Sequence, residues 1–204
     1  MRSIRGAVGE RGLVLAVPDL APTLFTVGIV QDLDYKVPQP NAAQRAMWHV
    51  SSSRPGAWLF ARSMHHIDKL LLRVSRGRVT LPGVMAGIPV LTVTTTGVRT
   101  GQPRTTPLLG VPFGDDIAII GTRFGQPGTP AWYYNLRTEP KLTVAYRDRD
   151  ITAVAREADE QEWRLIWDKA RIIYSGYEAY ARRIKDRRIH IMVLSTYVPP
   201  ASAG

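Results

Sequence analysis

The stretch TTTGVRTGQPRTTPLL, Thr94–Leu109, contains the turn that decides the fold. β-Branched threonines stand on both sides of a centre rich in glycine, which is typical of two strands joined by a hairpin. A hairpin that only reverses the chain does well with Asn-Gly or Asp-Gly. This turn instead carries Arg99 and Arg104 beside Gly97 and Gly101. We infer that it binds an anion, because arginine forks and glycine-rich turns both suit anionic groups.

Working outward from the hairpin, apolar or β-branched residues recur with a period of two, which is typical of strands. Turn signals such as FGDD and RDRD separate the segments, which are 89–96, 105–111, 117–122, 141–147, 151–157 and 189–197. Helices are expected at 130–136 and after Asp159, which forms a capping box with Glu162. The segments do not alternate as strand, helix, strand. The sequence therefore predicts a mainly β, α+β fold, an antiparallel six-stranded barrel with helices packed outside.

The charge balance limits the choice of partners. The chain of 204 residues has 27 Lys and Arg against 17 Asp and Glu, a net charge of +10 and a pI near 10.3. Such a balance points to nucleic acid, an anionic membrane surface or a polyanionic ligand. The predicted strands are apolar and threonine-rich and do not form the aromatic platforms of nucleic-acid binders. We therefore expect no nucleic-acid partner.

Several kinds of catalytic chemistry are absent from the sequence. There is no cysteine, which excludes disulfides, thiolate nucleophiles and cysteine-based metal sites and suits a reducing cytosol. The four histidines show no HExxH spacing, so no metal site is expected. The motifs GxSxG, GxxxxGK[ST] and GxGxxG do not occur. The chain offers no hydrolase elbow, P-loop or Rossmann phosphate turn.

Residues 1–46 are interpreted as a poorly defined N-terminal extension. The segment begins with basic residues and continues with an apolar run, which resembles a signal peptide. Pro18, Asp19 and Pro22 interrupt the apolar run early, so neither a signal peptide nor a spanning helix is expected. An alternative is that translation starts at Met47.

Residues 47–80 are predicted to contain a basic amphipathic helix, followed by the barrel domain at 81–204. Apolar residues recur at spacings of 4, 3, 4 and 3 along Phe60, Met64, Ile67, Leu71 and Val74. From Arg45 to Arg78 there are seven Lys or Arg and one acid, Asp68. Two interpretations stay open: a helix docked on the core with a solvated charged face, or a helix lying on an anionic membrane surface.

Four segments of the chain together resemble a known family. The order TTTGVRTGQPR, FGDDIAIIGTRFG, PAWYYNLRTEPKLTV and IIYSGYEAYARR resembles the deazaflavin-dependent nitroreductases and quinone reductases that use coenzyme F420. The resemblance covers about residues 58–198. It implies a split β-barrel and the cofactor F420, an 8-hydroxy-5-deazaflavin that carries a phosphate and a glutamate tail. It also implies hydride transfer from the reduced cofactor to a quinone or nitroaromatic acceptor.

The resemblance assigns the cofactor-binding residues. The phosphate is expected at the hairpin, where the family often has a second basic residue at the position of Val98. The ring is expected at the loop of Thr122 and Arg123, where the family usually has serine at 122 and glycine at 124. Trp132 and Asn135 match a family helix, but we expect both to serve mainly structure. The full set of predicted cofactor contacts is Gly97, Arg99, Thr100, Gly101, Arg104, Thr105, Pro107, Thr122, Arg123 and Trp132.

The resemblance also assigns the acceptor side of the site, to Tyr174, Tyr177 and Tyr180. Tyrosines at helical spacing are more often packing than chemistry, yet this region lines the substrate pocket in the family. The alternatives that stay open are an FMN-binding split-barrel oxidoreductase and a non-catalytic deazaflavin-binding protein, since FMN shares the phosphate. We expect a cytoplasmic enzyme, with peripheral attachment to the inner face of the cell membrane through the basic helix.

Overall fold

In the computed structural model the barrel is built from six strands, and each pairs with two neighbours. The structure describes residues 28–39, 41, 53, 55, 58, 89–185 and 187–199. Each neighbouring pair is antiparallel, and the order β1-β2-β3-β6-β5-β4 closes on itself because β4 pairs with β1. The strands are β1 (Val90–Thr96), β2 (Pro103–Phe113), β3 (Asp116–Ile120), β4 (Lys141–Tyr146), β5 (Arg149–Glu157) and β6 (Ile191–Thr196). The predicted six-stranded antiparallel barrel is confirmed.

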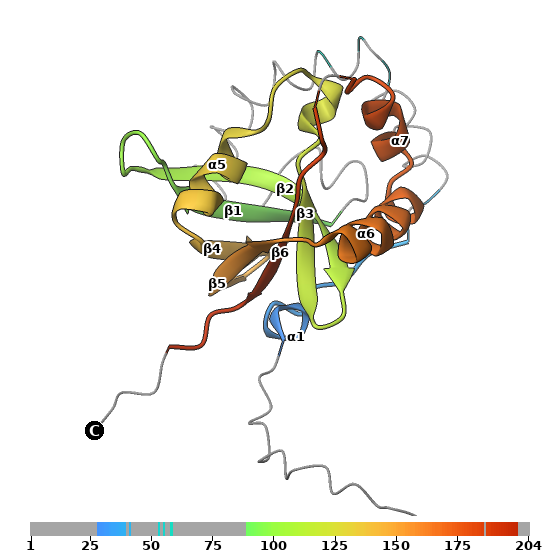
Figure 1. Ribbon diagram of the computed structural model, residues 1–204. Coiled ribbons are helices and arrows are strands. Elements are labelled where there is room, and N and C mark those ends of the chain that lie inside the picture. The colour runs from blue at the N-terminus through green and yellow to red at the C-terminus, as the bar shows by residue number, and fades with distance from the viewer. Residues whose placement is uncertain are drawn as a thin grey trace, which may run out of the picture.

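The helices lie outside the strands. Those whose bounds lie within the described residues are α1 (Ile29–Asp32), the 3₁₀ turn η1 (Arg123–Gly125), α5 (Ala131–Thr138), α6 (Glu160–Ile173) and α7 (Gly176–Ala181). Figure 1 shows α6 and α7 on the right-hand side of the barrel, with α1 below the strands. The predicted basic helix at residues 47–80 lies outside the described residues apart from Ser53, Pro55 and Trp58. Its proposed contact with a membrane therefore stays a prediction.

Two apolar clusters explain why some strands are apolar along their whole length. In β3, Ile117 and Ile119 belong to the cluster inside the barrel, whereas Ala118 and Ile120 belong to a cluster under α6 and α7. Successive side chains of a strand point to opposite faces. Both faces of β3 are thus buried, and β6 follows the same rule. A continuous apolar run is the pattern expected of a strand covered on both sides.

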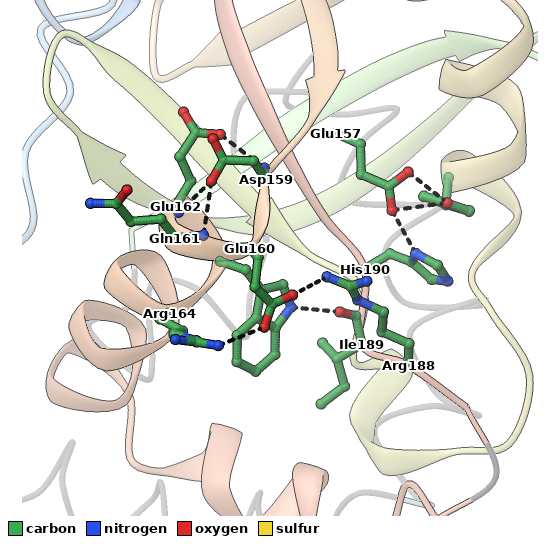
Figure 2. A network of polar contacts seen from close by, with 11 residues as sticks. Glu157, Asp159, Glu160, Gln161, Glu162, Arg164, Arg188, Ile189 and His190 are labelled. Atoms are coloured by element: carbon green, nitrogen blue, oxygen red, sulfur yellow. Dashed lines mark hydrogen bonds and ion pairs between the residues drawn. The ribbon is translucent and has the colours of Figure 1, made fainter.

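The predicted capping box opens α6. The carboxylate of Asp159 accepts from the backbone N–H of Gln161 at 2.9 Å and of Glu162 at 2.8 Å. The carboxylate of Glu162 accepts from the N–H of Asp159 at 3.0 Å (Figure 2). Three N–H donors at the start of the helix and its cap are satisfied in this way.

Residues 28–39, the described part of the N-terminal segment, pack against the barrel. We assigned residues 1–46 to an extension without defined structure, but Ile29 and Leu33 of that range are buried in the barrel core. The hydroxyl of Tyr35 lies 2.8 Å from the carbonyl of Pro89 and 2.7 Å from that of Gly110, so it donates to both. A Cβ at Gly110 would lie 2.5 Å from this hydroxyl, so any larger residue there would have to displace the Tyr35 ring. The segment therefore covers one end of the barrel.

Candidate functional site

The β1–β2 hairpin presents the two predicted arginines on an exposed turn. The N–H of Gly97 donates to the carbonyl of Gln102 at 2.9 Å, and that of Gly101 donates to Gly97 at 2.8 Å. Gly101 has a φ of 65°, which glycine adopts at little cost. Arg99 and Arg104 are both exposed. The guanidinium of Arg104 donates through Nη2 to Thr100 Oγ1 at 3.3 Å, so it lies back over the turn.

The positive charge of this turn is not neutralised by a carboxylate within the part of the chain that the structure describes. None of the ion pairs found there involves Arg99 or Arg104. The other predicted residues of the hairpin surround the two arginines: Gly97 is buried, Thr100, Gly101 and Thr105 are exposed, and Pro107 is half-buried. Exposed arginine forks that no described carboxylate neutralises fit the phosphate of the predicted cofactor.

Helix α5 holds the hairpin in place. Asn135 is 4% exposed, and its Oδ1 accepts from the N–H of Val98 at 3.1 Å. Its Nδ2 donates to Thr95 Oγ1 at 2.9 Å. Asn135 thus bonds the backbone of the turn, as we expected. Trp132 is 5% exposed and belongs to the barrel core, which agrees with the structural role that we favoured; its contact with a cofactor stays a prediction.

The predicted ring-facing loop has an unusual backbone. Arg123 and Phe124 have φ values of 47° and 55°, so two consecutive non-glycine residues lie in the left-handed region. Such a residue costs about 1 kcal/mol or more, and this cost is typical of functional sites. Thr122 is buried and Arg123 is exposed. Arg123 Nη1 donates to the carbonyl of Pro127 at 2.8 Å, which closes the loop.

The three tyrosines form a buried cluster. Tyr174, Tyr177 and Tyr180 are 6%, 4% and 4% exposed, and the hydroxyls of Tyr174 and Tyr180 share a hydrogen bond of 3.0 Å. Burial raises the pKa of Tyr177 and of Tyr180 well above the ordinary value of a phenol, and the neighbouring Tyr174 adds to both shifts. Both phenols therefore stay protonated and can donate but not act as phenolates. Their contact with an acceptor stays a prediction.

The structure brings the predicted residues together in two groups. The hairpin lies against α5 through Asn135, while η1 packs against α7. The rings of Phe124 and Tyr180 meet edge to face with centroids 6.0 Å apart. Helix α5 begins six residues after η1 in the sequence and ends beside the hairpin, so it links the two groups. Figure 1 shows α5 and α7 on different sides of the barrel.

A shallow surface hollow of about 260 Å³ lies beside the hairpin rather than at the predicted ring loop. It is lined by residues of β1, β2, β4 and β5, namely Thr94, Thr95, Thr96, Pro103, Lys141, Leu142, Thr143 and Thr152. None of the predicted cofactor residues is among them. We assign no role to this hollow.

Sequence reasoning missed one polar cluster, formed by Tyr133, Glu157 and His190. The hydroxyl of Tyr133 donates to the Glu157 carboxylate at 3.0 Å, and His190 Nδ1 lies 2.8 Å from Glu157 Oε1 (Figure 2). The rings of Tyr133 and His190 stack with centroids 4.0 Å apart. Burial raises the pKa of Glu157, but the hydrogen bonds from His190 and Tyr133 outweigh it and the net shift is downward. The pairing of β5 with β6 brings Glu157 close to His190, and the contact of α5 with β5 adds Tyr133, so no local motif could have revealed the cluster.

Arg187 was missed as well. Its Nη1 donates to the carbonyl of Gly121 at 2.9 Å and its Nη2 donates to that of Thr122 at 3.2 Å. It therefore contacts the backbone of the loop that is predicted to face the ring. It stands in the basic run KDRRIH, where nothing distinguishes it from its neighbours.

Comparisons with known proteins agree with this geometry. Residues 68–196, which include the hairpin, the loop and all six strands, match the sequence model described as F420H(2)-dependent quinone reductase. The chain belongs to this family. The hairpin, PAWYYNL and tyrosine segments had indicated the coenzyme F420-dependent nitroreductase and quinone reductase family, so that prediction is confirmed.

Individual relatives carry the same name. An F420H(2)-dependent quinone reductase of Mycobacterium tuberculosis is 27% identical over 133 residues, which cover 58% of this chain and 87% of the relative. A putative F420H(2)-dependent quinone reductase of Mycobacterium bovis matches equally. The solved structure of an F420-H2 dependent reductase, FDR-A, is 30% identical with a TM-score of 0.48 and covers 52% of this chain and 93% of that one.

Two further findings concern the described residues. No helix among them is long and apolar enough to cross a membrane. The same residues contain no group of three or more His, Cys, Asp or Glu side chains that could hold a metal ion.

Proposed function

We propose that this member of the F420H(2)-dependent quinone reductase family binds coenzyme F420 and passes a hydride from its reduced form to a quinone. The observation that carries the proposal is the β1–β2 hairpin, which presents Arg99 and Arg104 without a carboxylate partner among the described residues. It lies within the matched range of the family. A phosphate supplies the missing anion.

The residues fit the cofactor in chemical terms. Arg99 and Arg104 would hold the phosphate through charge-assisted hydrogen bonds, and the glycine-rich turn lets backbone N–H groups approach it. Asn135 keeps the turn in position because it bonds both β1 and the Val98 amide. The loop at Thr122 and Arg123 would offer an amide and a hydroxyl to the carbonyl edge of the ring.

When bound, F420 supplies the hydride chemistry itself. The protein has to align the ring with the acceptor and exclude water, which needs no catalytic triad. We place the acceptor beside Tyr174, Tyr177 and Tyr180. Burial raises the pKa of Tyr177 and of Tyr180, so these two phenols stay neutral and can donate a hydrogen bond to a quinone oxygen. A nitroaromatic with a flat ring could be orientated by the same donors.

The deciding experiment measures cofactor binding and turnover. Quenching of tryptophan fluorescence should show saturable binding of F420 and much weaker binding of FMN. Repeated reduction of a soluble quinone by reduced F420 then distinguishes an enzyme from a carrier. A protein that binds FMN tightly and F420 weakly would favour the FMN alternative, and binding without turnover would favour a carrier. A nitroaromatic in place of the quinone tests the second acceptor class.

The hairpin makes a specific prediction. Arg104→Ala should weaken F420 binding by about 1.5 to 3 kcal/mol, or roughly ten- to a hundredfold, because a charge-assisted bond to phosphate is lost. Arg164→Ala is the matched control, since Arg164 lies on α6 and its side chain is 71% exposed. It removes the same charge and should leave the dissociation constant unchanged. Equal effects of the two substitutions would show that the hairpin has no specific role.

A further inference from the structure

The segment Arg188–His190, just before β6, is held to the outside of the barrel chiefly through Ile189 and His190, and Arg188 adds only a surface ion pair. Arg188 Nη2 pairs with Glu160 Oε2 at 3.0 Å, and the indole N–H of Trp163 donates to the carbonyl of Ile189 at 2.8 Å. His190 Nδ1 lies 2.8 Å from Glu157 (Figure 2). The segment is therefore held by α6 and β5, and it can support the loop that follows β3.

This support reaches the loop that follows β3. The N–H of Gly121 donates to the carbonyl of His190 at 2.8 Å. Arg187 adds two hydrogen bonds from the same side, to the carbonyl of Gly121 at 2.9 Å and to that of Thr122 at 3.2 Å. Three hydrogen bonds thus hold two residues, immediately before the left-handed pair Arg123 and Phe124.

The direction of these bonds has a consequence for the amide of Arg123. The carbonyl of Thr122 and the N–H of Arg123 belong to one planar trans peptide group, so they point in opposite directions. Because that carbonyl faces Arg187, the N–H of Arg123 points away from Arg187. In the described part of the chain this N–H makes no backbone or side-chain hydrogen bond, whereas the N–H of Thr122 donates to Ile120 at 3.0 Å. The Arg123 amide is therefore a free donor with a fixed direction.

Arg187 makes these bonds under unfavourable conditions. It forms no ion pair with a carboxylate within the described ranges. Burial, and then the like charge of Arg123, lower the pKa of Arg187. Its Nε is buried and has no hydrogen-bond partner there. A buried donor without a partner destabilises the folded state. Arg187 therefore makes its hydrogen bonds to the loop carbonyls at a cost.

We propose that Arg187 is a positioning residue for the cofactor ring: it holds the peptide group between Thr122 and Arg123 so that the Arg123 amide is aimed at the carbonyl edge of the deazaflavin. The proposal rests on the proposed function. Arg187 acts through Gly121 and Thr122 and does not touch the cofactor. A loop fixed before binding loses less entropy when the cofactor arrives, which favours affinity.

The test compares Arg187→Met with Arg188→Met. Both substitutions remove one positive charge from adjacent residues, but only the first removes the bonds to the loop. Arg188 is exposed, and its surface ion pair with Glu160 contributes little. The dissociation constant for oxidised F420 is measured by tryptophan fluorescence. Amide exchange is measured in the cofactor-free protein at Gly125 and Gln126, whose N–H groups donate to Thr122 and Arg123.

We expect Arg187→Met to weaken F420 binding about tenfold or more and to speed exchange at these two amides. Arg188→Met should change both quantities less than about twofold. Arg187→Lys keeps the charge but offers no fork of donors, so it should recover only part of the affinity. If Arg187→Met does not fold, the lysine variant, compared with Arg188→Met, decides the matter in the same way.

Two results would overturn the proposal: unchanged F420 affinity in the Arg187 variants, or exchange at Gly125 and Gln126 that rises no more than in the rest of the barrel. Failure of the wild-type protein to bind F420 is a different outcome, because it removes the proposed function. The exchange measurement needs no cofactor. It would still show whether Arg187 holds the loop.

Discussion

At the scale of the single residue, Phe124 shows what a sequence can and cannot reveal. The resemblance to the family implies glycine here, and the observed backbone, with φ 55° and ψ 26°, suits a glycine. Phe124 accepts the left-handed conformation and packs its ring edge to face against Tyr180. Glycine would remove the strain but also the packing. Phenylalanine at this position therefore adds backbone strain and gains an aromatic contact with Tyr180.

This exchange predicts an inverted order of stability at position 124. Phe124→Ala loses the ring but keeps the Cβ that makes a left-handed residue costly, whereas Phe124→Gly loses both. We expect the glycine variant to be more stable than the alanine variant by about 1 kcal/mol. At an ordinary helical position the order is reversed. Chemical denaturation of both variants checks this, and a more stable alanine variant would contradict the left-handed backbone.

A local sequence pattern indicates some of the site residues but not others. Arg99 and Arg104 could be proposed because arginines are out of place in a plain hairpin turn. Arg187 could not, because its role depends on carbonyls 65 and 66 residues away in the sequence. His190 and Glu157 are likewise joined only through strand pairing. Contacts of this kind follow from topology, which a single sequence does not specify.

At the scale of the element, α6 is defined at its start by its own sequence. The Asp159 carboxylate accepts from two N–H groups of the first turn, and the capping box predicted from Asp159 and Glu162 is complete. Asp159→Ala should lower the free energy of unfolding by about 1 kcal/mol, since the first-turn N–H groups lose their acceptor. Urea denaturation measures this. Asp168→Ala, in the middle of the same helix, is the control and should have a smaller effect.

Glu162 gives the same helix a dependence on pH. The hydrogen bond from Arg156, supported by the Asp159 amide and opposed by burial, lowers the pKa of Glu162 below its ordinary value of 4.5. A depressed carboxyl pKa stabilises the folded state above the unfolded value, and this contribution is lost as the pH falls through the folded pKa. Glu162→Gln keeps a capping acceptor but loses the charge. The difference in unfolding free energy between the two proteins should therefore shrink on acidification from about pH 7 to below about pH 4. A constant difference would show that the ion pair is not responsible.

Strands could be predicted more completely than short helices. Alternating or β-branched residues marked all six strands, although β3 and β6 are buried on both faces and therefore read as continuous apolar runs. Helix α1 has only four residues, Ile29–Asp32, which is too short for a helical period to show. Its apolar residues were read as part of an extension, although they are among the most buried in the protein.

At the scale of the whole molecule, closure of the sheet leaves no free edge, and the N-terminal segment completes one end. Val30 N–H donates to the carbonyl of Asp115 in the β2–β3 turn, and Thr196 at the end of β6 donates to Asp32 at 2.6 Å. Arg149 at the start of β5 donates to the carbonyl of Asp32. One short segment thus joins three separate strands or turns. The barrel and this segment form a single core.

This core predicts how stable a chain that begins at Met47 would be. Such a chain lacks Ile29 and Leu33, which are 0% and 1% exposed, and Tyr35, whose ring meets Tyr146 edge to face at 4.7 Å. Truncating one large buried apolar side chain costs about 2 to 5 kcal/mol. Losing three such residues approaches the total stability of about 5 to 15 kcal/mol that is usual for a domain. We expect the chain from Met47 to unfold at a much lower temperature or to aggregate, as measured by thermal unfolding beside the full chain.

The full chain with Ile29→Ala and Leu33→Ala separates the loss of these contacts from the loss of chain length. It should be destabilised in the same direction, and equal stability of all three proteins would show that the segment does not belong to the core.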